Sequence, residues 1–136
     1  MKKLIYISHP SLGLESNTKD IEKVIRALYK SDKIFNNFSF VSPVHCYGFM
    51  YNDESTEEHY NRGLNYCTDL LEHCDGMIVV GDWMHSKGCT AEIDMCNAKG
   101  IPYILFDSSD KITSMKEFEL VKSLDYLLQY EENKQQ

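Results

Sequence analysis

The chain has 136 residues, the length of one domain, and carries a net charge of −7 with a pI of about 5.1. This acidic balance argues against proteins that bind nucleic acid by neutralising phosphates and against polybasic proteins of membrane surfaces. Hydrophobic residues make up 43% and charged residues 26%, so we expect one globular domain over residues 1–136, with a frayed polar tail at 131–136.

No apolar stretch approaches the roughly 18 residues that cross a bilayer, and the short apolar run near the N-terminus does not read as a secretory signal. We therefore expect a cytoplasmic protein that contacts no membrane. The five cysteines show no Cys-x-x-Cys spacing, which predicts reduced, mostly buried thiols rather than disulfides or a zinc site. The adjacent pairs His45-Cys46 and His73-Cys74 leave a metal or redox role as an alternative, although neighbours on a helix face different ways. We expect no cofactor and no metal.

The first third of the chain predicts strand, helix and strand in turn. Leu4–Ser8 is a short buried strand, and 16–18 supplies Ser, Asn and Thr as candidate N-caps. Apolar residues then recur at helical spacing and predict a helix ending near 30–33: Ile21, Val24, Ile25 and Leu28. Phe38–Val41 is a second strand, and the aperiodic segment His45–Thr56 reads as a long loop with a functional or interface role.

The rest of the chain continues the alternation of helices and strands. The expected elements are a helix at Glu57–Cys74, a strand at Gly76–Val80, a loop at Asp82–Lys87, a helix at Gly88–Lys99, a strand at Ile101–Phe106, and a helix at Met115–Tyr130 capped by Ser114. This alternation predicts a doubly wound, Rossmann-like or flavodoxin-like α/β domain. Its parallel sheet has four or five strands with helices on both faces.

Ligands of such sheets bind outside the carboxyl ends of the strands, which directs attention to two loops. The loop after the first strand contains hydroxyls, an imidazole and a glycine: Ser8, His9, Ser11 and Gly13. These groups suit a phosphate or a sugar. The loop lacks the Gly-Lys-Ser/Thr of a P-loop and the GxGxxG fingerprint, so an ordinary strand-to-helix turn is the alternative.

The loop after the third strand leads into a helix whose first residues suit an anion. Ser86, Lys87 and Gly88 lie where free N–H groups of a helix N-terminus point toward a ligand. The alternative is that Ser86 is only an N-cap. Glu92 lies about one turn further on, where a solvated surface glutamate is the ordinary interpretation.

Four further residues near this loop are ambiguous. Asp75 directly precedes the apolar strand, where an aspartate is often a turn residue, and Asp82 and His85 allow a similar interpretation. Trp83 is the only tryptophan of the chain, and a single large aromatic in such a loop more often covers a rim than takes part in chemistry.

Four short segments in this order resemble the nucleoside 2-deoxyribosyltransferase superfamily over roughly residues 4–106. They are Ile-Tyr-Ile-Ser at 5–8, Cys-Asp-Gly-Met-Ile-Val-Val at 74–80, Ser-Lys-Gly-Cys-Thr-Ala-Glu at 86–92, and Ala-Lys-Gly-Ile-Pro at 98–102. The chain is most similar to small phage and bacterial members of uncharacterised activity. It also shares features with the branch that hydrolyses deoxynucleoside 5′-monophosphates.

The resemblance implies a role for each matching residue. Glu92 takes the place of the nucleophile, Asp75 that of the aspartate that helps transfer a proton to the leaving base, and Tyr6 that of the tyrosine that orients the nucleophile. Ser86, six residues before Glu92, matches the serine with which the monophosphate branch contacts the 5′-phosphate. The resemblance also implies a homo-oligomer, a dimer or higher, with shared sites.

The chain departs from the family pattern in three places. Ser8 or His9 replaces the glycine usual after the first strand, and Leu12 stands where the monophosphate branch carries an arginine. A phosphate would then depend on Lys87 or His9 for positive charge. The loop at 45–56 has no counterpart that can be aligned.

Two functions from different classes follow. The first is a hydrolase or transferase that breaks the N-glycosidic bond of a (deoxy)nucleoside or its 5′-monophosphate through a covalent glycosyl-enzyme on Glu92, by the logic of retaining glycosidases. Asp75 would be the acid, its pKa raised by apolar neighbours. The second is a module that binds, sequesters or senses a nucleotide in the same cleft without turnover.

Overall fold

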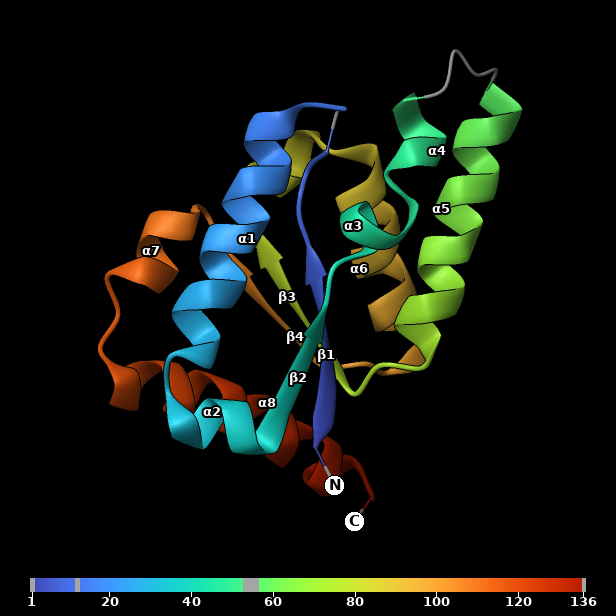
Figure 1. Cartoon of the computed structure of the whole chain (residues 1–136). Coiled ribbons are helices and arrows are strands. Elements are labelled where there is room, and N and C mark those ends of the chain that lie inside the picture. Colours follow the sequence, from blue (N-terminus) through green and yellow to red (C-terminus); the bar gives the residue numbers. More distant parts are fainter. Residues whose placement is uncertain (1, 12, 53–56, 136) are drawn as a thin grey trace.

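A computed structural model describes residues 2–11, 13–52 and 57–135 of the chain. Its sheet has four parallel strands in the order β2-β1-β3-β4: β1 (Lys3–Ser8), β2 (Phe38–Val41), β3 (Gly76–Val80) and β4 (Tyr103–Phe106). The strands all point the same way, upward in Figure 1. The expected doubly wound α/β fold with a parallel sheet is therefore confirmed.

The two central strands bury side chains on both faces of the sheet. Ile5 and Ile7 of β1 and Ile78 of β3 belong to one apolar cluster, whereas Tyr6 and Met77 belong to another. Successive side chains of a strand point to opposite faces, so each strand contributes to both clusters. A sheet covered on both sides explains why the sequence of β3 is an unbroken apolar run.

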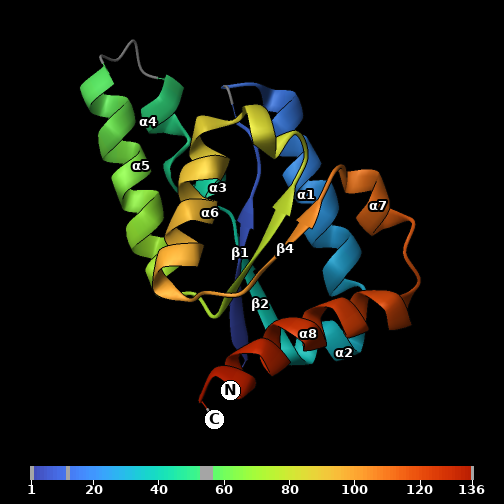
Figure 2. The ribbon, with the colours of Figure 1, turned by 180° about the vertical axis from the view of Figure 1, so that it is seen from behind.

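Helices cover the two faces unequally (Figures 1 and 2). On the face of Ile5 and Ile7 lie α1 (Glu15–Tyr29), α2 (Asp32–Asn37), α7 (Ser109–Thr113) and α8 (Glu117–Gln135). On the face of Tyr6 lie α5 (Glu57–Glu72) and α6 (Lys87–Lys99), with the short α3 (Pro43–Tyr47) and α4 (Phe49–Asn52) beside α5. The helix α6 starts just after the carboxyl end of β3, following a short 3-10 helix at Trp83–His85.

The segment expected to be one long loop is instead partly helical. The described part of 45–56 lies in α3 and α4, and residues 53–56 are outside the described part of the chain. Ser42 caps α3 by accepting a hydrogen bond from the backbone N–H of His45, and Pro43 occupies the first turn. A helix this short has no apolar period, so only the Ser-Pro signal could have predicted it.

Capping geometry corrects two other helix predictions and accounts for one helix that was not expected. The helix α1 begins at Glu15 after Leu14, without a side-chain cap from 16–18. The helix α2 was not expected, although Ser31 caps it by accepting from the N–H of Ile34. Ser114 ends α7 rather than beginning the last helix.

The last helix also differs from its expected bounds: α8 runs from Glu117 to Gln135, so residues 131–135 extend it. The described helices include none that is long and apolar enough to cross a membrane. The prediction of mostly buried thiols is confirmed, because the cysteines are free and all except Cys46 are buried. Within the described ranges, no group of three or more His, Cys, Asp or Glu side chains is placed to hold a metal ion.

Candidate functional site

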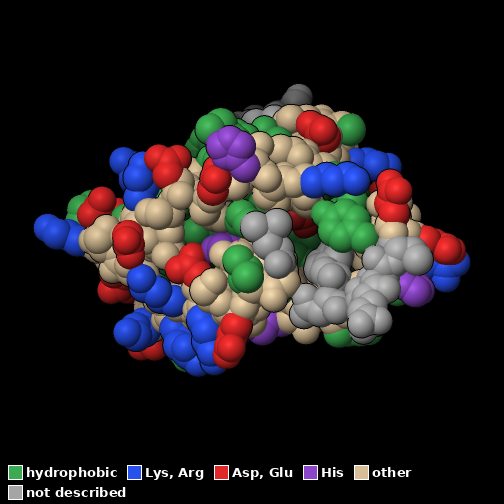
Figure 3. All heavy atoms as spheres, turned by 90° about the horizontal axis from the view of Figure 1, so that it is seen from above, with side chains coloured by type: hydrophobic (Ala, Val, Ile, Leu, Met, Phe, Trp, Pro, Cys, Tyr) green, Lys and Arg blue, Asp and Glu red, His purple; other side chains and the backbone are tan. Residues whose placement is uncertain are grey.

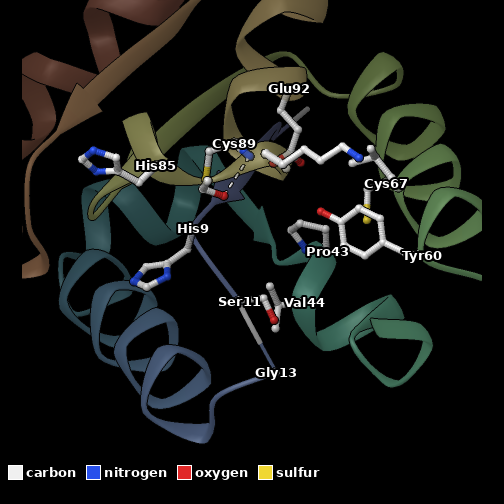
Figure 4. Close-up of a pocket in the computed structure, with 14 residues that line it drawn as sticks. His9, Ser11, Gly13, Pro43, Val44, Tyr60, Cys67, His85, Cys89 and Glu92 are labelled. Atoms are coloured by element: carbon white, nitrogen blue, oxygen red, sulfur yellow. Dashed lines mark hydrogen bonds between the residues drawn. The ribbon is translucent and has the colours of Figure 1, made fainter. Parts of the chain in front are cut away.

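A cavity of about 260 Å³ opens at the carboxyl end of β1, between the loop that follows β1 and the helices on the Tyr6 face of the sheet. Figure 3 looks onto this end of the molecule, where the surface is hollowed near its centre. The lining combines groups from β1's loop, α3, α5 and the start of α6: His9, Ser11, Gly13, Pro43, Val44, Tyr60, Leu64, Cys67, His85, Ser86, Lys87, Gly88, Cys89 and Glu92 (Figure 4). Its position is the one at which parallel sheets bind ligands.

Glu92 lies at the buried end of this cavity, with only 5% of its surface exposed. The hydroxyl of Tyr6 donates a hydrogen bond to Oε2 of Glu92, and the hydroxyl of Ser8 donates one to Oε1 at 2.9 Å. Both donors come from β1, where residues two apart point to the same face. The carboxylate is therefore fixed by one hydroxyl on each oxygen. The interpretation of Glu92 as a solvated surface residue is excluded.

The protonation of Glu92 is set by opposing effects. Burial raises the pKa of Glu92 to about 7, although the hydrogen bonds from Tyr6 and Ser8 act in the lowering direction. Burial disfavours the charged form because it removes water, whereas hydroxyl donors favour that form. At neutral pH the group is thus divided between a proton-accepting carboxylate and a neutral acid.

The start of α6 forms the polar side of the cavity. Ser86 is the N-cap of α6, and its hydroxyl accepts from the N–H of Cys89 at 3.2 Å. The side of Gly88 where a Cβ would stand is open, because a Cβ built on Gly88 would meet only the Ser86 hydroxyl, at 4.0 Å. The ammonium of Lys87 lies 5.4 Å from the ring centroid of Tyr60. A helix N-terminus with a serine and a lysine suits an anionic group.

His9 is a buried residue on the same side of the cavity. Its Nδ1 lies 2.7 Å from the carbonyl oxygen of Pro10, and its Nε2 lies 2.7 Å from a carboxylate oxygen of Asp20. Burial acts to raise the pKa of Asp20, but hydrogen bonds from Ser109 and His9 and nearby positive charges outweigh it and hold the pKa below its ordinary value. The two contacts hold the imidazole ring of His9 in a fixed orientation at the cavity.

The opposite side of the cavity is apolar. Tyr60 and Leu64 of α5 and Val44 of α3 form it, and burial, followed by the charge of Glu92, raises the pKa of Tyr60. A flat aromatic group fits such a wall. Tyr60 and Leu64 stand four residues apart in the helix predicted at Glu57–Cys74, but such spacing cannot tell whether a helix face meets the core or a cavity.

The structure does not bring Asp75 to this cavity. Asp75 precedes β3, at the amino ends of the strands, and its Oδ2 accepts from the N–H of Leu4 at 2.8 Å. Its own N–H donates to the carbonyl of Leu4, also at 2.8 Å, so Asp75 ties β3 to β1. The position does not support the proton-transfer role that the resemblance implied, because Glu92 lies toward the carboxyl ends.

Two residues of the loop after β3 also lie apart from the cavity, and one position in the loop after β1 lies outside the described residues. Trp83 is half-buried and packs against the apolar cluster around Tyr6. Asp82 is exposed, and its carboxylate accepts from Nδ1 of His85 at 2.8 Å. Leu12, where an arginine was expected from the resemblance, lies outside the described residues. The cavity is lined by seven of the expected residues: His9, Ser11, Gly13, Ser86, Lys87, Gly88 and Glu92. Tyr6 and Ser8 do not line it but donate hydrogen bonds to Glu92.

Comparison with known proteins identifies a family match without an activity. Residues 3–106 match the model of a family described as "Domain of unknown function (DUF7768)". The match spans the sheet from β1 to β4 and so includes every strand and the cavity residues described above. No curated protein matches the chain.

Proposed function

The chain belongs to the DUF7768 family, and we propose that it cleaves or transfers the N-glycosidic bond of a (deoxy)nucleoside or its 5′-monophosphate. The observation that carries this proposal is the buried Glu92, held by the hydroxyls of Tyr6 and Ser8 at the end of a cavity. The cavity is apolar on one side and suited to an anion on the other. The resemblance to nucleoside 2-deoxyribosyltransferases supports the same assignment.

In the proposed reaction, the ionised carboxylate of Glu92 attacks C1′ of the sugar. The C1′–N bond breaks, its electron pair goes to the base, and a glycosyl ester forms on Glu92. The base takes up a proton from water, because the Asp75 carboxyl lies at the other end of the strands. Water then attacks C1′, returns the carboxylate and gives the free sugar; a second base attacking instead gives transfer.

The two sides of the cavity orient the substrate for this attack. The base stacks on the apolar side beside Tyr60, and the 5′-phosphate lies at the start of α6, beside Ser86 and Lys87. In a chain of net charge −7, the phosphate needs concentrated local donors, which Lys87 and the N-terminus of α6 supply. We therefore favour a nucleoside monophosphate over a free nucleoside.

One observation favours a second candidate, a nucleotide-binding module without turnover. Among the described residues that line the cavity, Glu92 is the only carboxylate, so no second carboxyl group is placed there to protonate a leaving base. The same cavity can then hold a nucleotide intact. Its Glu92, when protonated, would donate a hydrogen bond to the ligand instead of attacking it.

Base release by wild-type protein and by Glu92→Gln separates these functions. A panel of (deoxy)nucleosides and their 5′-monophosphates is incubated with each protein, and free base is measured by chromatography. A nucleophile predicts a loss of about 10³-fold or more in Glu92→Gln. Asp94→Asn is the matched control, because Asp94 is an exposed carboxylate on the same helix.

Two outcomes decide against catalysis. Equal turnover by Glu92→Gln and wild type removes Glu92 from the mechanism. Stoichiometric recovery of an intact nucleotide from the wild-type protein, with no base released from any member of the panel, selects the binding module.

A further inference from the structure

A second cavity, of about 350 Å³, lies beside the first at the same end of the sheet. The two cavities share His9, His85 and Ser86, so these residues form the boundary between them. In Figure 4 the side chains of His9 and His85 point away from Tyr60. The nucleotide proposed above would place its phosphate at this boundary, beside Ser86.

The lining of the second cavity differs in chemistry from that of the first. It is rich in carboxylate, amide and hydroxyl groups: Asn17, Asp20, Asp82, Asp107, Ser108 and Ser109. The described lining contains no Phe, Tyr or Trp on which a base could stack. Carboxylates also repel a further phosphate. A hydroxyl-rich neutral group fits this lining, because carboxylate and amide oxygens accept hydrogen bonds from hydroxyls.

We propose that the two cavities form one groove for a nucleotide whose phosphate carries a second, hydroxyl-rich group, as in a nucleoside diphosphate sugar. This inference rests on the proposed function. The base lies beside Tyr60, C1′ lies over Glu92, the phosphates cross the boundary at Ser86, and the sugar enters the second cavity.

The hydrogen bonds of His9 connect the two halves of this groove. The imidazole of His9 lies at the boundary, where the phosphates would cross, and Asp20 fixes it from the side of the second cavity. The hydroxyl of Ser109 in turn donates to Asp20 at 2.6 Å and holds that carboxylate in place. A residue at the crossing is thus held in place by side chains of the second cavity.

The test measures binding in Glu92→Gln, which retains the groove and lacks the nucleophile. The dissociation constants of AMP, ADP and ADP-ribose, and of UMP, UDP and UDP-glucose, are measured by calorimetry. The groove predicts that ADP-ribose or UDP-glucose binds at least about tenfold more tightly than the diphosphate of the same nucleoside.

Changing the second cavity should abolish this advantage. Asp107 and Ser108 follow β4 in the lining of the second cavity, and the Asp107 side chain is largely exposed, where it pairs with Lys111. Asp107→Asn combined with Ser108→Ala is expected to bring the Kd of the sugar-bearing ligand to within about twofold of the diphosphate. Asp125→Asn, an exposed change on α8, is the control and should keep the full tenfold ratio.

The outcomes separate this inference from the proposed function. Equal affinity for the diphosphate and the sugar-bearing ligand, or an advantage that persists in the double variant, overturns the groove. If monophosphates bind to Glu92→Gln and the wild type releases base from them, but the sugar adds no affinity, only the groove is wrong. If none of the six nucleotides binds, the groove fails, and base release from the (deoxy)nucleoside panel decides the proposed function separately.

Discussion

Replacing Glu92 by Gln tests whether the carboxyl of Glu92 is as buried as the structure indicates, and the test needs no substrate. Gln has nearly the same size, and its amide oxygen can accept a hydrogen bond from Tyr6 or Ser8, but it does not ionise. In the wild type, the folded chain holds the Glu92 proton more tightly than the unfolded chain, because burial raises the pKa to about 7 from an ordinary value of 4.5.

The sign of the effect follows from proton binding. Between pH 4.5 and 7 the folded state binds more protons than the unfolded state, so the free energy of unfolding of the wild type falls as the pH rises. A pKa of about 7 against 4.5 corresponds to about 3 kcal/mol in total. Of this, about 2–3 kcal/mol develops between pH 5 and pH 8. Glu92→Gln lacks this contribution and should gain stability relative to the wild type by that amount.

Urea unfolding at pH 5, 6, 7 and 8 measures the effect through the fluorescence of the single tryptophan, Trp83, and circular dichroism. Asp94→Asn removes the same charge from an exposed site on α6 and corrects for the change in net charge. Parallel pH profiles for Glu92→Gln and wild type would refute the reasoning, because they would mean that the Glu92 carboxyl ionises as freely in the folded chain as in the unfolded chain.

Three further predictions follow from the contacts around the cavity. Ser8→Ala removes one hydrogen-bond donor from Glu92, so the pKa of Glu92 and the midpoint of the pH profile of kcat/KM should rise. Ser8→Thr keeps the hydroxyl and should have the wild-type midpoint, and an unchanged midpoint in Ser8→Ala would contradict the contact. Asp75→Ala should lower the free energy of unfolding, measured in urea, by about 1–2 kcal/mol, while base release per folded molecule stays within about threefold of the wild type. A loss of base release comparable to that of Glu92→Gln would show that Asp75 takes part in the mechanism. Lys87→Ala should weaken binding of a nucleoside monophosphate by about 1 kcal/mol, or about fivefold in Kd, and leave the Kd of the free nucleoside unchanged. An equal effect on both ligands would show that Lys87 does not contact the phosphate.

The sheet could be predicted from the sequence because its signals are local and agree with one another. Gly76–Val80 is an apolar run bounded by Asp75 and Gly81, and Phe38–Val41 ends at a Ser-Pro pair, so both strands have the predicted bounds. The short helices α2 and α3 were missed because they contain too few residues to show an apolar period. Their signals are the capping serines Ser31 and Ser42.

The candidate site could be predicted in part. The pattern of the segment 86–92 located Glu92 and the anion-binding side, but the sequence could not show that Ser8 donates to Glu92 rather than to a ligand. Tyr60 was hidden in a helix face, since the same spacing serves a core and a cavity wall. Asp75 was assigned from the resemblance, although a residue that precedes a parallel strand lies at the end opposite the ligand.

Mass spectrometry of the protein during turnover tests the central claim most directly. The wild type is incubated with a 2-fluoro-substituted nucleoside monophosphate, in which the fluorine slows hydrolysis of the intermediate, then quenched in acid and digested. The proposed mechanism predicts one adduct, the 2-fluoro sugar 5-phosphate joined through C1 to the peptide that contains Glu92, and no adduct in Glu92→Gln. Base release without an adduct on that peptide, or an adduct on a different residue, would contradict the role of Glu92 as the nucleophile.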